Sequence, residues 1–217
     1  IILGINEVRS VALGFAIQNH FKTHSNNFDP VRFWKHSIIC SQIAKYLAKY
    51  FNVFDDGTFF LAGLIHDIGK LVIDQYFPEE FKAIVNRIAA NQCTFSKAEK
   101  ELLGVTHYQI GAKLLRQWHF PEKVIMQIFY HHAPWHDKNF TTESAILYLA
   151  NIFTKISGFT CSAEEKPVTA SDIMKPALLE FLNKTGLDMD EESYKNLQLL
   201  IREHISAETN NVLTMFE

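Results

Sequence analysis

Hydrophobic residues recur at intervals of three and four along most of the chain, which is the spacing of one face of an α-helix. Asp29 followed by Pro30 suits the start of one such helix, as an N-cap and a first helical residue. No Asn-Gly hairpin signal and no useful run of alternating β-branched residues occurs. The pattern therefore predicts an all-α fold. The clearest apolar stripe consists of Ile38, Ile39, Ile43, Leu47, Tyr50 and Phe51.

Capping signals predict where several other helices begin. Ser96 with Glu99 has the spacing of a capping box, and so has Thr106 with Gln109. Gly104 separates the two helices that these boxes open.

The second half of the chain shows the same signals. Pro121 predicts a helix over residues 121–132. Gly158 predicts the end of a helix that begins near residue 142, and Asp190 the start of a last long helix. The polar segment 160–171 predicts a connecting loop that is too short to separate independent domains.

The composition excludes several classes of protein. With 217 residues, 47% hydrophobic and 21% charged, the chain is neither disordered nor collagen-like. No apolar run approaches the ~18 residues of a membrane-spanning helix, so no membrane partner is expected. The net charge of −3 argues against a nucleic-acid partner. Cys40, Cys93 and Cys161 are far apart, which suits a reducing, cytoplasmic location.

The first residues, Ile1 to Gly4, include no initiator methionine and no basic stretch. This start is not that of a secretory signal. We expect the sequence to begin inside a larger protein.

Aromatic side chains at helical spacing are expected in the core, where such residues usually pack. We expect this of Trp34 and Trp118. Trp135 lies in a polar loop and is expected either in the core or at the mouth of a pocket. His136 and Asp137 of the same loop are expected to be solvated.

Histidines are concentrated in one part of the chain, with seven of the ten between residues 36 and 136. His66 and Asp67 are adjacent, and imidazole with carboxylate suits Fe, Mn, Co, Ni or Zn. An ionised Asp67 after the apolar run 61–65 needs a cation or strong donors. The spacing leaves two simpler roles open: an ion pair with Lys70, or the cap of a helix that begins at Gly69. Any single histidine here is also compatible with a hydrogen-bonded core residue.

The order of these motifs resembles a known superfamily. Residues 33–37 (Phe-Trp-Lys-His-Ser) and 60–71 (Phe-Leu-Ala-Gly-Leu-Ile-His-Asp-Ile-Gly-Lys-Leu) resemble the HD superfamily of metal-dependent phosphohydrolases. Further motifs narrow the resemblance to the HDOD subfamily, a signalling-associated branch that is related to HD-GYP proteins. These motifs lie at residues 77–81, 99–111, 114–115, 118–121 and 130–132.

The resemblance implies an HD-type helical bundle with additional C-terminal helices. It covers residues 1–157, and the opening residues resemble a helix start in the middle of the family domain. The expected division is therefore an HDOD domain over 1–158, without its N-terminal part, and a helical extension over 159–217 that packs on the same domain.

The resemblance also assigns roles to individual residues. Three residues match the first ligands of the HD metal site, and three match histidines that HD-GYP phosphodiesterases use for a second metal. Lys70 matches a basic residue near the substrate phosphate, so Asp67 and Lys70 are the implied catalytic residues. The implied cofactor is one or two divalent transition ions, Fe, Mn, Zn or Ni. The first set is His36, His66 and Asp67, and the second is His107, His131 and His132.

The last ligand of the HD site is an aspartate, and Asn151 stands at that position. Asparagine offers a neutral oxygen, which leaves Asp67 as the one carboxylate among neutral imidazoles. We expect such a site to bind metal more weakly and to hold anions well. Asp74, Asp137 and Glu143 are conceivable replacement acids, although no motif supports them.

Two functions follow from the resemblance and from Asn151. The favoured one is a regulatory module that binds a metal or a phosphate-containing ligand with little or no turnover. The alternative is an active phosphodiesterase on a nucleotide or cyclic dinucleotide, with Lys70 stabilising the developing charge. A dinuclear iron site for oxygen chemistry, as in some HD-fold oxygenases, is a third hypothesis. The expected partners are other signalling domains or proteins, a phosphate-containing small molecule, and a second copy of the chain through the apolar stripe of the last helix.

Overall fold

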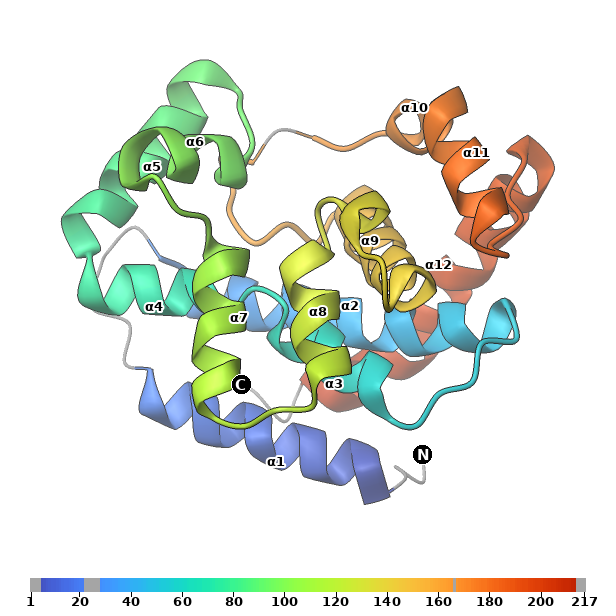
Figure 1. Ribbon diagram of the computed structural model, residues 1–217, viewed down its shortest axis with the longest axis horizontal. Coiled ribbons are helices and arrows are strands. Elements are labelled where there is room, and N and C mark those ends of the chain that lie inside the picture. Colours follow the sequence, from blue (N-terminus) through green and yellow to red (C-terminus); the bar gives the residue numbers. More distant parts are fainter. Residues whose placement is uncertain (1–4, 22–27, 166, 214–217) are drawn as a thin grey trace.

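The computed structural model describes residues 5–21, 28–165 and 167–213, and for residues 5–7 and 206–213 it describes the backbone alone. Within these residues every regular element is a helix, so the all-α prediction is confirmed (Figure 1). The helices are α1 (Ile5–His20), α2 (Pro30–Tyr50), α3 (Thr58–Ile65), α4 (Ile68–Tyr76), α5 (Pro78–Asn91), α6 (Phe95–Leu103), α7 (His107–Gln117), α8 (Glu122–Tyr130), the 3₁₀ turn η1 (Pro134–His136), α9 (Thr141–Ile156), α10 (Ala170–Ile173), α11 (Pro176–Lys184) and α12 (Glu191–Leu213).

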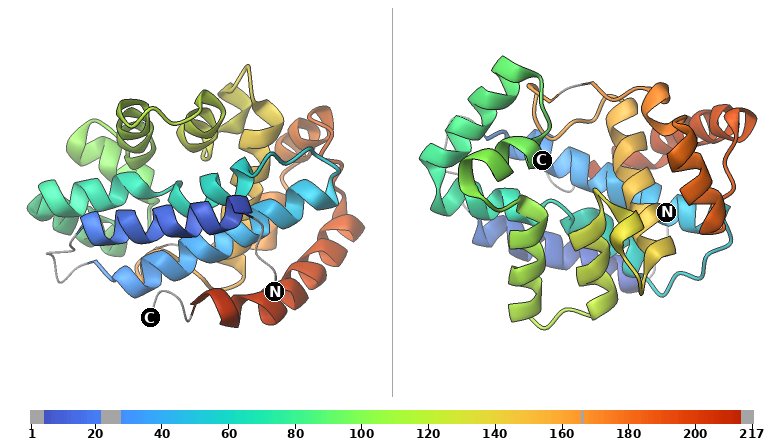
Figure 2. Two further views of the ribbon diagram at one scale, coloured as in Figure 1. Left: turned by 90° about the horizontal axis from the view of Figure 1, so that it is seen from below. Right: turned by 45° about the horizontal axis from the view of Figure 1, so that its top comes forward.

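The long helix α2 forms the centre of the bundle. Four residues of its predicted stripe, Ile38, Ile39, Ile43 and Leu47, are fully shielded from solvent, and Tyr50 and Phe51 are half-buried. It packs against α3, α9 and α12, while α4 packs on α7 and α7 on α8. Helix α1 lies along the underside of the bundle against α3 (Figure 2). The candidate site residues lie where α2, the α3–α4 turn, α7 and the end of α8 meet.

Several predicted helix ends are confirmed. Asp29 is the N-cap of α2, and its carboxylate accepts a hydrogen bond from the Arg32 amide at 2.9 Å. Thr106 and Gln109 form the capping box of α7. Asp190 precedes α12, and its carboxylate accepts from the Ser193 amide at 2.7 Å.

The capping box predicted for Ser96 and Glu99 is wrong. The N-cap of α6 is Thr94, whose hydroxyl accepts from the Lys97 amide at 3.3 Å. Glu99 is fully buried and makes its hydrogen bonds to His107 instead. A side chain on the inner face of α6 cannot also reach back to the solvent-exposed start of its helix.

The expectation of a solvated Asp137 is also wrong. Asp137 is 3% exposed, and its Oδ1 accepts hydrogen bonds from the amides of Asn139 and Phe140 at 2.9 and 3.0 Å. Its Oδ2 accepts from the Ser144 hydroxyl at 2.6 Å. Asp137 therefore stabilises the start of α9, whereas the neighbouring His136 is exposed as expected.

The three tryptophans differ in burial. Trp34 is in the core, but Trp118 is 38% exposed and Trp135 is 49% exposed. The core expectation is therefore wrong for Trp118. The Trp135 indole makes T-shaped contacts with the rings of Tyr148 and Phe181, at centroid distances of 6.0 and 6.1 Å.

The segment between α9 and α10 is a loop, as predicted, up to Thr169. Its chain runs from the end of α9 towards α6 and returns to α10 (Figure 1). Cys161 is buried along this path, and the Glu165 side chain is 6% exposed. None of the helices described here combines the length and the apolar character that a bilayer crossing requires.

Candidate metal centre

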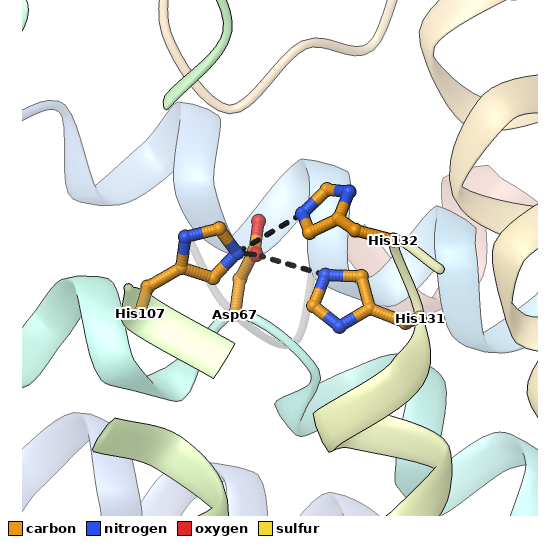
Figure 3. A group of neighbouring side chains, drawn as sticks. All are labelled: Asp67, His107, His131 and His132. Carbon is orange, nitrogen blue, oxygen red and sulfur yellow. Dashed lines mark hydrogen bonds and ion pairs between the residues drawn. The ribbon is translucent and has the colours of Figure 1, made fainter. Parts of the chain in front are cut away.

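Five histidines and one aspartate from four parts of the fold meet in the interior. His36 comes from α2, and His66 and Asp67 come from the turn between α3 and α4. His107 begins α7, and His131 and His132 directly follow α8. Figure 3 shows Asp67 between the His107 ring and the two rings of His131 and His132. All six predicted metal-ligand residues other than Asn151 are therefore brought together.

Two glycines allow the helices to approach closely enough for this convergence. A Cβ on Gly69 would lie 1.9 Å from the carbonyl oxygen of His107, so only glycine lets α4 touch the start of α7. A Cβ on Gly63 would lie 2.5 Å from the Cα of Ser41, so α3 touches α2 in the same way. These contacts place His107 beside Asp67 and His66 beside His36.

Three of the histidines are oriented by backbone carbonyl groups. His36 Nδ1 lies 2.8 Å from the oxygen of Phe159, and His66 Nδ1 lies 2.8 Å from that of Gly63. His131 Nδ1 lies 2.6 Å from the oxygen of Ile128. Because a carbonyl oxygen only accepts, each Nδ1 carries a proton and donates it. In the neutral ring Nε2 then has a free lone pair, which is the arrangement of a metal-binding histidine.

His107 is oriented by a carboxylate that the sequence reasoning missed as a site residue. Glu99 Oε2 accepts hydrogen bonds from His107 Nδ1 at 2.7 Å and from the His107 amide at 2.9 Å. Burial disfavours the charged imidazole, but the Glu99 carboxylate raises the pKa of His107 above its usual value. The position of Glu99 in the motif at residues 99–111 is the sequence signal for a role in the site, but its spacing from Ser96 predicts a helix cap instead.

The Nε2 atoms converge on the two oxygens of Asp67. Oδ2 lies 3.4 Å from His66 Nε2 and 3.7 Å from His36 Nε2. Oδ1 lies 3.1 Å from His107 Nε2 and 3.8 Å from His131 Nε2. The two oxygens of the Asp67 carboxylate therefore face different sets of imidazoles.

Within these sets the ring nitrogens are very close. His36 Nε2 lies 3.2 Å from His66 Nε2, and His107 Nε2 lies 3.1 Å from His132 Nε2. Two imidazole lone pairs at such distances repel unless a proton or a cation lies between them. In each of two groups, all ligand atoms lie within 4.8 Å of one another. The groups are His36, His66 and Asp67, and Asp67, His107, His131 and His132.

Burial and neighbouring charges separate the pKa values in the cluster. Burial, with the charge on His66, lowers the pKa of His36 to about 3. Burial opposes the charge on His66 as well, but the Asp67 carboxylate raises the pKa of His66 to about 10. Burial likewise opposes ionisation of Asp67, yet His66 and Lys70 hold its pKa well below its usual value. At neutral pH Asp67 is therefore an anion with a proton held on His66 beside it.

The donor set fits a divalent transition ion. Imidazole nitrogens with one carboxylate suit Fe, Mn, Ni or Zn better than Mg or Ca. Three buried atoms at the site have no hydrogen-bond partner among the described residues: Asp67 Oδ1, His131 Nε2 and Asn151 Oδ1. His131 and Asn151 line the same cavity.

Lys70 makes the ion pair with Asp67 that the sequence left open. Its Nζ donates to Asp67 Oδ2 at 2.7 Å and lies 4.4 Å from the ring centre of Phe95. Asp67 also occupies the N-cap position of α4, but its side chain makes no capping hydrogen bond. Its carboxylate is turned towards Lys70 and the histidines instead.

None of the three conceivable replacement acids belongs to the groups of converging ligand atoms among the described residues. Asp137 stabilises the start of α9, and Glu143 lies 3.5 Å from Lys123. Asp74 is buried on α4. Besides Glu99, a second acid approaches the site: Glu165 lies 3.9 Å from Lys70, in the loop that the sequence predicts as an ordinary connection, and no motif marks it.

A cavity of about 490 Å³ adjoins the histidine cluster. It is lined by residues from α4, α6, α9 and the loop before α10. The charged and metal-site residues along its wall include Lys70, His131, His132, Asn151, Lys155 and Glu165.

Comparison with known proteins gives a family match and a shared fold. Residues 1–134 match the sequence model of the family described as HDOD domain. Over 99% of its length the chain matches a "Putative signal transduction protein" of Marinobacter aquaeolei VT8, with a TM-score of 0.75 and 24% identity. Over 97% of its length, and 72% of the other chain, it matches a "Putative phosphohydrolase" of Shewanella amazonensis SB2B, with a TM-score of 0.71 and 21% identity. At these identities the similarity shows the fold.

The chain spans only part of some of these proteins. It covers 45% of the Marinobacter chain. It is also 30% identical over 73 residues to an uncharacterized protein of Treponema pallidum (strain Nichols), and these residues are 34% of this chain and 14% of that protein.

Proposed function

This chain belongs to the HDOD domain family, and from this premise we propose that it is a regulatory signal-transduction module that binds a divalent transition ion and a phosphate-containing ligand with little or no turnover. The observation that carries the proposal is the convergence of imidazole Nε2 atoms on both oxygens of Asp67. A purely structural cluster would have no need to direct so many lone pairs at one carboxylate.

The chain's own residues favour binding over turnover. Asn151 offers a neutral amide where the related hydrolases have a carboxylate, which weakens retention of the ion. Lys70 is held by its 2.7 Å hydrogen bond to Asp67, which leaves its other two N–H groups to contact a bound phosphate. A bound ion would supply a Lewis acid that lowers the pKa of a water molecule. The name of the Marinobacter protein, which has the same fold, is in line with a signalling role.

An active phosphohydrolase is the second candidate function. Its support is the retention of six matching side chains in a buried, converging arrangement, together with the name of the Shewanella protein. In this case Lys70 would stabilise charge on the phosphate, and the Asp67 cluster would hold the ion. Asn151 argues against it.

Metal analysis of purified variants tests the proposal. We expect the protein, purified without chelators and incubated with Mn²⁺, Fe²⁺ or Zn²⁺, to retain at least one ion per chain after gel filtration. Asp67→Asn and His66→Ala should lose most of it, while the exposed His136→Ala serves as the matched control and should not. Retention of no ion by the unaltered protein, or equal retention by Asp67→Asn, would contradict the proposal.

The same samples distinguish the two candidate functions. Hydrolysis of bis(p-nitrophenyl) phosphate is measured with each metal. Turnover that depends on metal and disappears in His66→Ala would favour the phosphohydrolase, whereas metal retention without turnover is the result expected for the regulatory module.

A further inference from the structure

A glutamate from the segment after α9 lies buried between two lysines. The Glu165 side chain is 6% exposed, and its Oε2 lies 2.7 Å from Nζ of Lys155. Its Oε1 lies 3.9 Å from Nζ of Lys70. Two ammonium groups thus converge on one carboxylate, and this is an arrangement that binds an oxyanion.

These three side chains line the cavity beside the histidine cluster. The Lys155 side chain is 15% exposed and that of Lys70 is 2% exposed, so both charges are largely shielded from solvent. The cavity of about 490 Å³ also reaches His131 and His132. Its size is in the range of sites for small organic ligands rather than for single inorganic ions.

The hydrogen bonding of Glu165 is incomplete. Its Oε1 is buried and has no hydrogen-bond partner within the described part of the chain. An unmet buried acceptor is destabilising, so this oxygen has the capacity to accept a further hydrogen bond. The Glu165 carboxylate therefore pairs with Lys155 through one oxygen and leaves its other oxygen without a hydrogen bond.

We propose that Lys155 joins Lys70, which the family resemblance already places near a phosphate, in a subsite for the phosphate group of a ligand beside the metal centre, and that Glu165 occupies this subsite as an internal competitor. The inference rests on the proposed function for the kind of ligand, a phosphate-containing small molecule. Glu165 places one negative charge where a phosphate group would place up to two. Ligand binding then requires that the Glu165 carboxylate leave Lys155.

Charge balance supports a group more negative than a carboxylate. The Lys70 ammonium is balanced by Asp67, and the Lys155 ammonium is balanced by Glu165. A divalent ion at Asp67 adds positive charge that no further acid among the converging ligand atoms offsets. A phosphate group satisfies both lysines and this additional charge better than Glu165 does.

Glu165 could instead replace the carboxylate that is missing at position 151. The geometry favours competition, because Glu165 is absent from the groups whose ligand atoms lie within 4.8 Å of one another. One of its oxygens is also held by Lys155 at 2.7 Å. A role as a metal ligand is therefore one outcome of the test.

Calorimetric titration of the 217-residue chain with inorganic phosphate in metal-free, chelator-treated buffer tests the inference. The variant is Glu165→Gln, which keeps a hydrogen-bond acceptor for Lys155 but removes the competing charge. We expect it to bind phosphate about tenfold more tightly than the unaltered chain. The matched control is Glu164→Gln, whose carboxylate bonds to the Ser162 hydroxyl and lines a different cavity. Glu164→Gln should bind phosphate like the unaltered chain, and Glu165→Gln with Lys155→Met should lose the gain.

Thermal unfolding and metal content complete the test. Phosphate should raise the unfolding temperature of Glu165→Gln more than that of the unaltered chain, which also shows that the variant is folded. Unchanged or weaker phosphate binding by Glu165→Gln overturns the inference, and so does a loss of metal as large as that of Asp67→Asn. The titration needs no metal. If the chain retains no ion but Glu165→Gln binds phosphate more tightly, the subsite is supported and only the metal-binding proposal is contradicted.

Discussion

Asp67 presents one carboxylate oxygen to His36 and His66 and the other to His107 and His131. A buried carboxylate is costly unless cations or strong donors meet it, and here Lys70 and protonated His66 supply that charge without metal. Metal binding must therefore compete with a proton.

The pH dependence of metal affinity follows from this competition. The neighbouring Asp67 holds the pKa of His66 near 10, so His66 carries a proton below that pH in the metal-free protein. An ion needs the neutral imidazole, and binding must release the proton. We expect apparent Zn²⁺ affinity to rise by about tenfold per pH unit between pH 6 and 8. Titration calorimetry in buffers of different ionisation enthalpy should detect the released proton, and affinity that is independent of pH would contradict this view.

Glu99 is predicted to control the basicity of His107. Glu99→Gln keeps the hydrogen-bond acceptor but removes the charge that raises the pKa of His107. Loss of such an outer carboxylate is expected to weaken metal binding by about tenfold. Glu101→Gln is the control, because Glu101 is on the same helix, 41% exposed, and 3.7 Å from Arg87. Metal affinity is measured by competition with a chromophoric chelator. Equal affinities for the two variants would show that Glu99 has no influence on metal binding.

At the scale of helices, close contacts bring residues distant in sequence to the same place. The α4–α7 contact at Gly69 puts His107 beside Asp67, and the α2–α3 contact at Gly63 puts His66 beside His36. These glycines have no positive φ, so their role is to let backbones touch. The site therefore depends on how the helices pack as well as on the ligands.

Gly69→Ala is predicted to disrupt this packing. The new Cβ would lie 1.9 Å from a backbone oxygen of His107, and backbone cannot move aside as a side chain can. We expect a loss of about 3 kcal/mol of unfolding free energy in urea denaturation, with loss of metal binding. Gly104→Ala is the comparison, because its Cβ meets nothing within 4 Å and only its φ of +72° is unfavourable. It should cost about 1 kcal/mol and leave metal binding intact.

The cluster of Asp67 and five histidines joins α2, the α3–α4 turn, α7 and the end of α8, which are distant in sequence. A ligand that binds only the folded state stabilises it in proportion to the logarithm of its concentration. Zn²⁺ at about 100 times its dissociation constant should add about 2.7 kcal/mol, or a rise of roughly 5–10 °C in the unfolding temperature. Differential scanning calorimetry measures this rise. Asp67→Asn should show little of it, and an equal rise in that variant would place the ion elsewhere.

Local sequence signals predicted the elements well. Asp29, Thr106 and Asp190 act through neighbours three residues away, and their roles are confirmed. The capping interpretation of Glu99 failed because its partner, His107, lies eight residues away across a turn. The sequence predicts a solvated Asp137 because its amide and hydroxyl partners become close only when the loop folds.

The site was predictable to the extent that its residues lie in recognisable motifs. The structure brings His36, His66, Asp67, His107, His131 and His132 together, as the family resemblance implied. Glu165 could not be found in this way, because it lies in a polar loop without a motif and approaches Lys70 and Lys155 only through the path of that loop. Contacts between segments that are distant in sequence have no local signal.

Asp67 and the surrounding histidines are proposed to hold a transition ion. A crystal of the chain grown with Zn²⁺ and measured on both sides of the zinc absorption edge tests this directly. We predict an anomalous difference peak between Asp67 and the Nε2 atoms of its neighbouring histidines. Zinc peaks confined to surface sites, with the interior cluster bridged by protons or water alone, would contradict the claim.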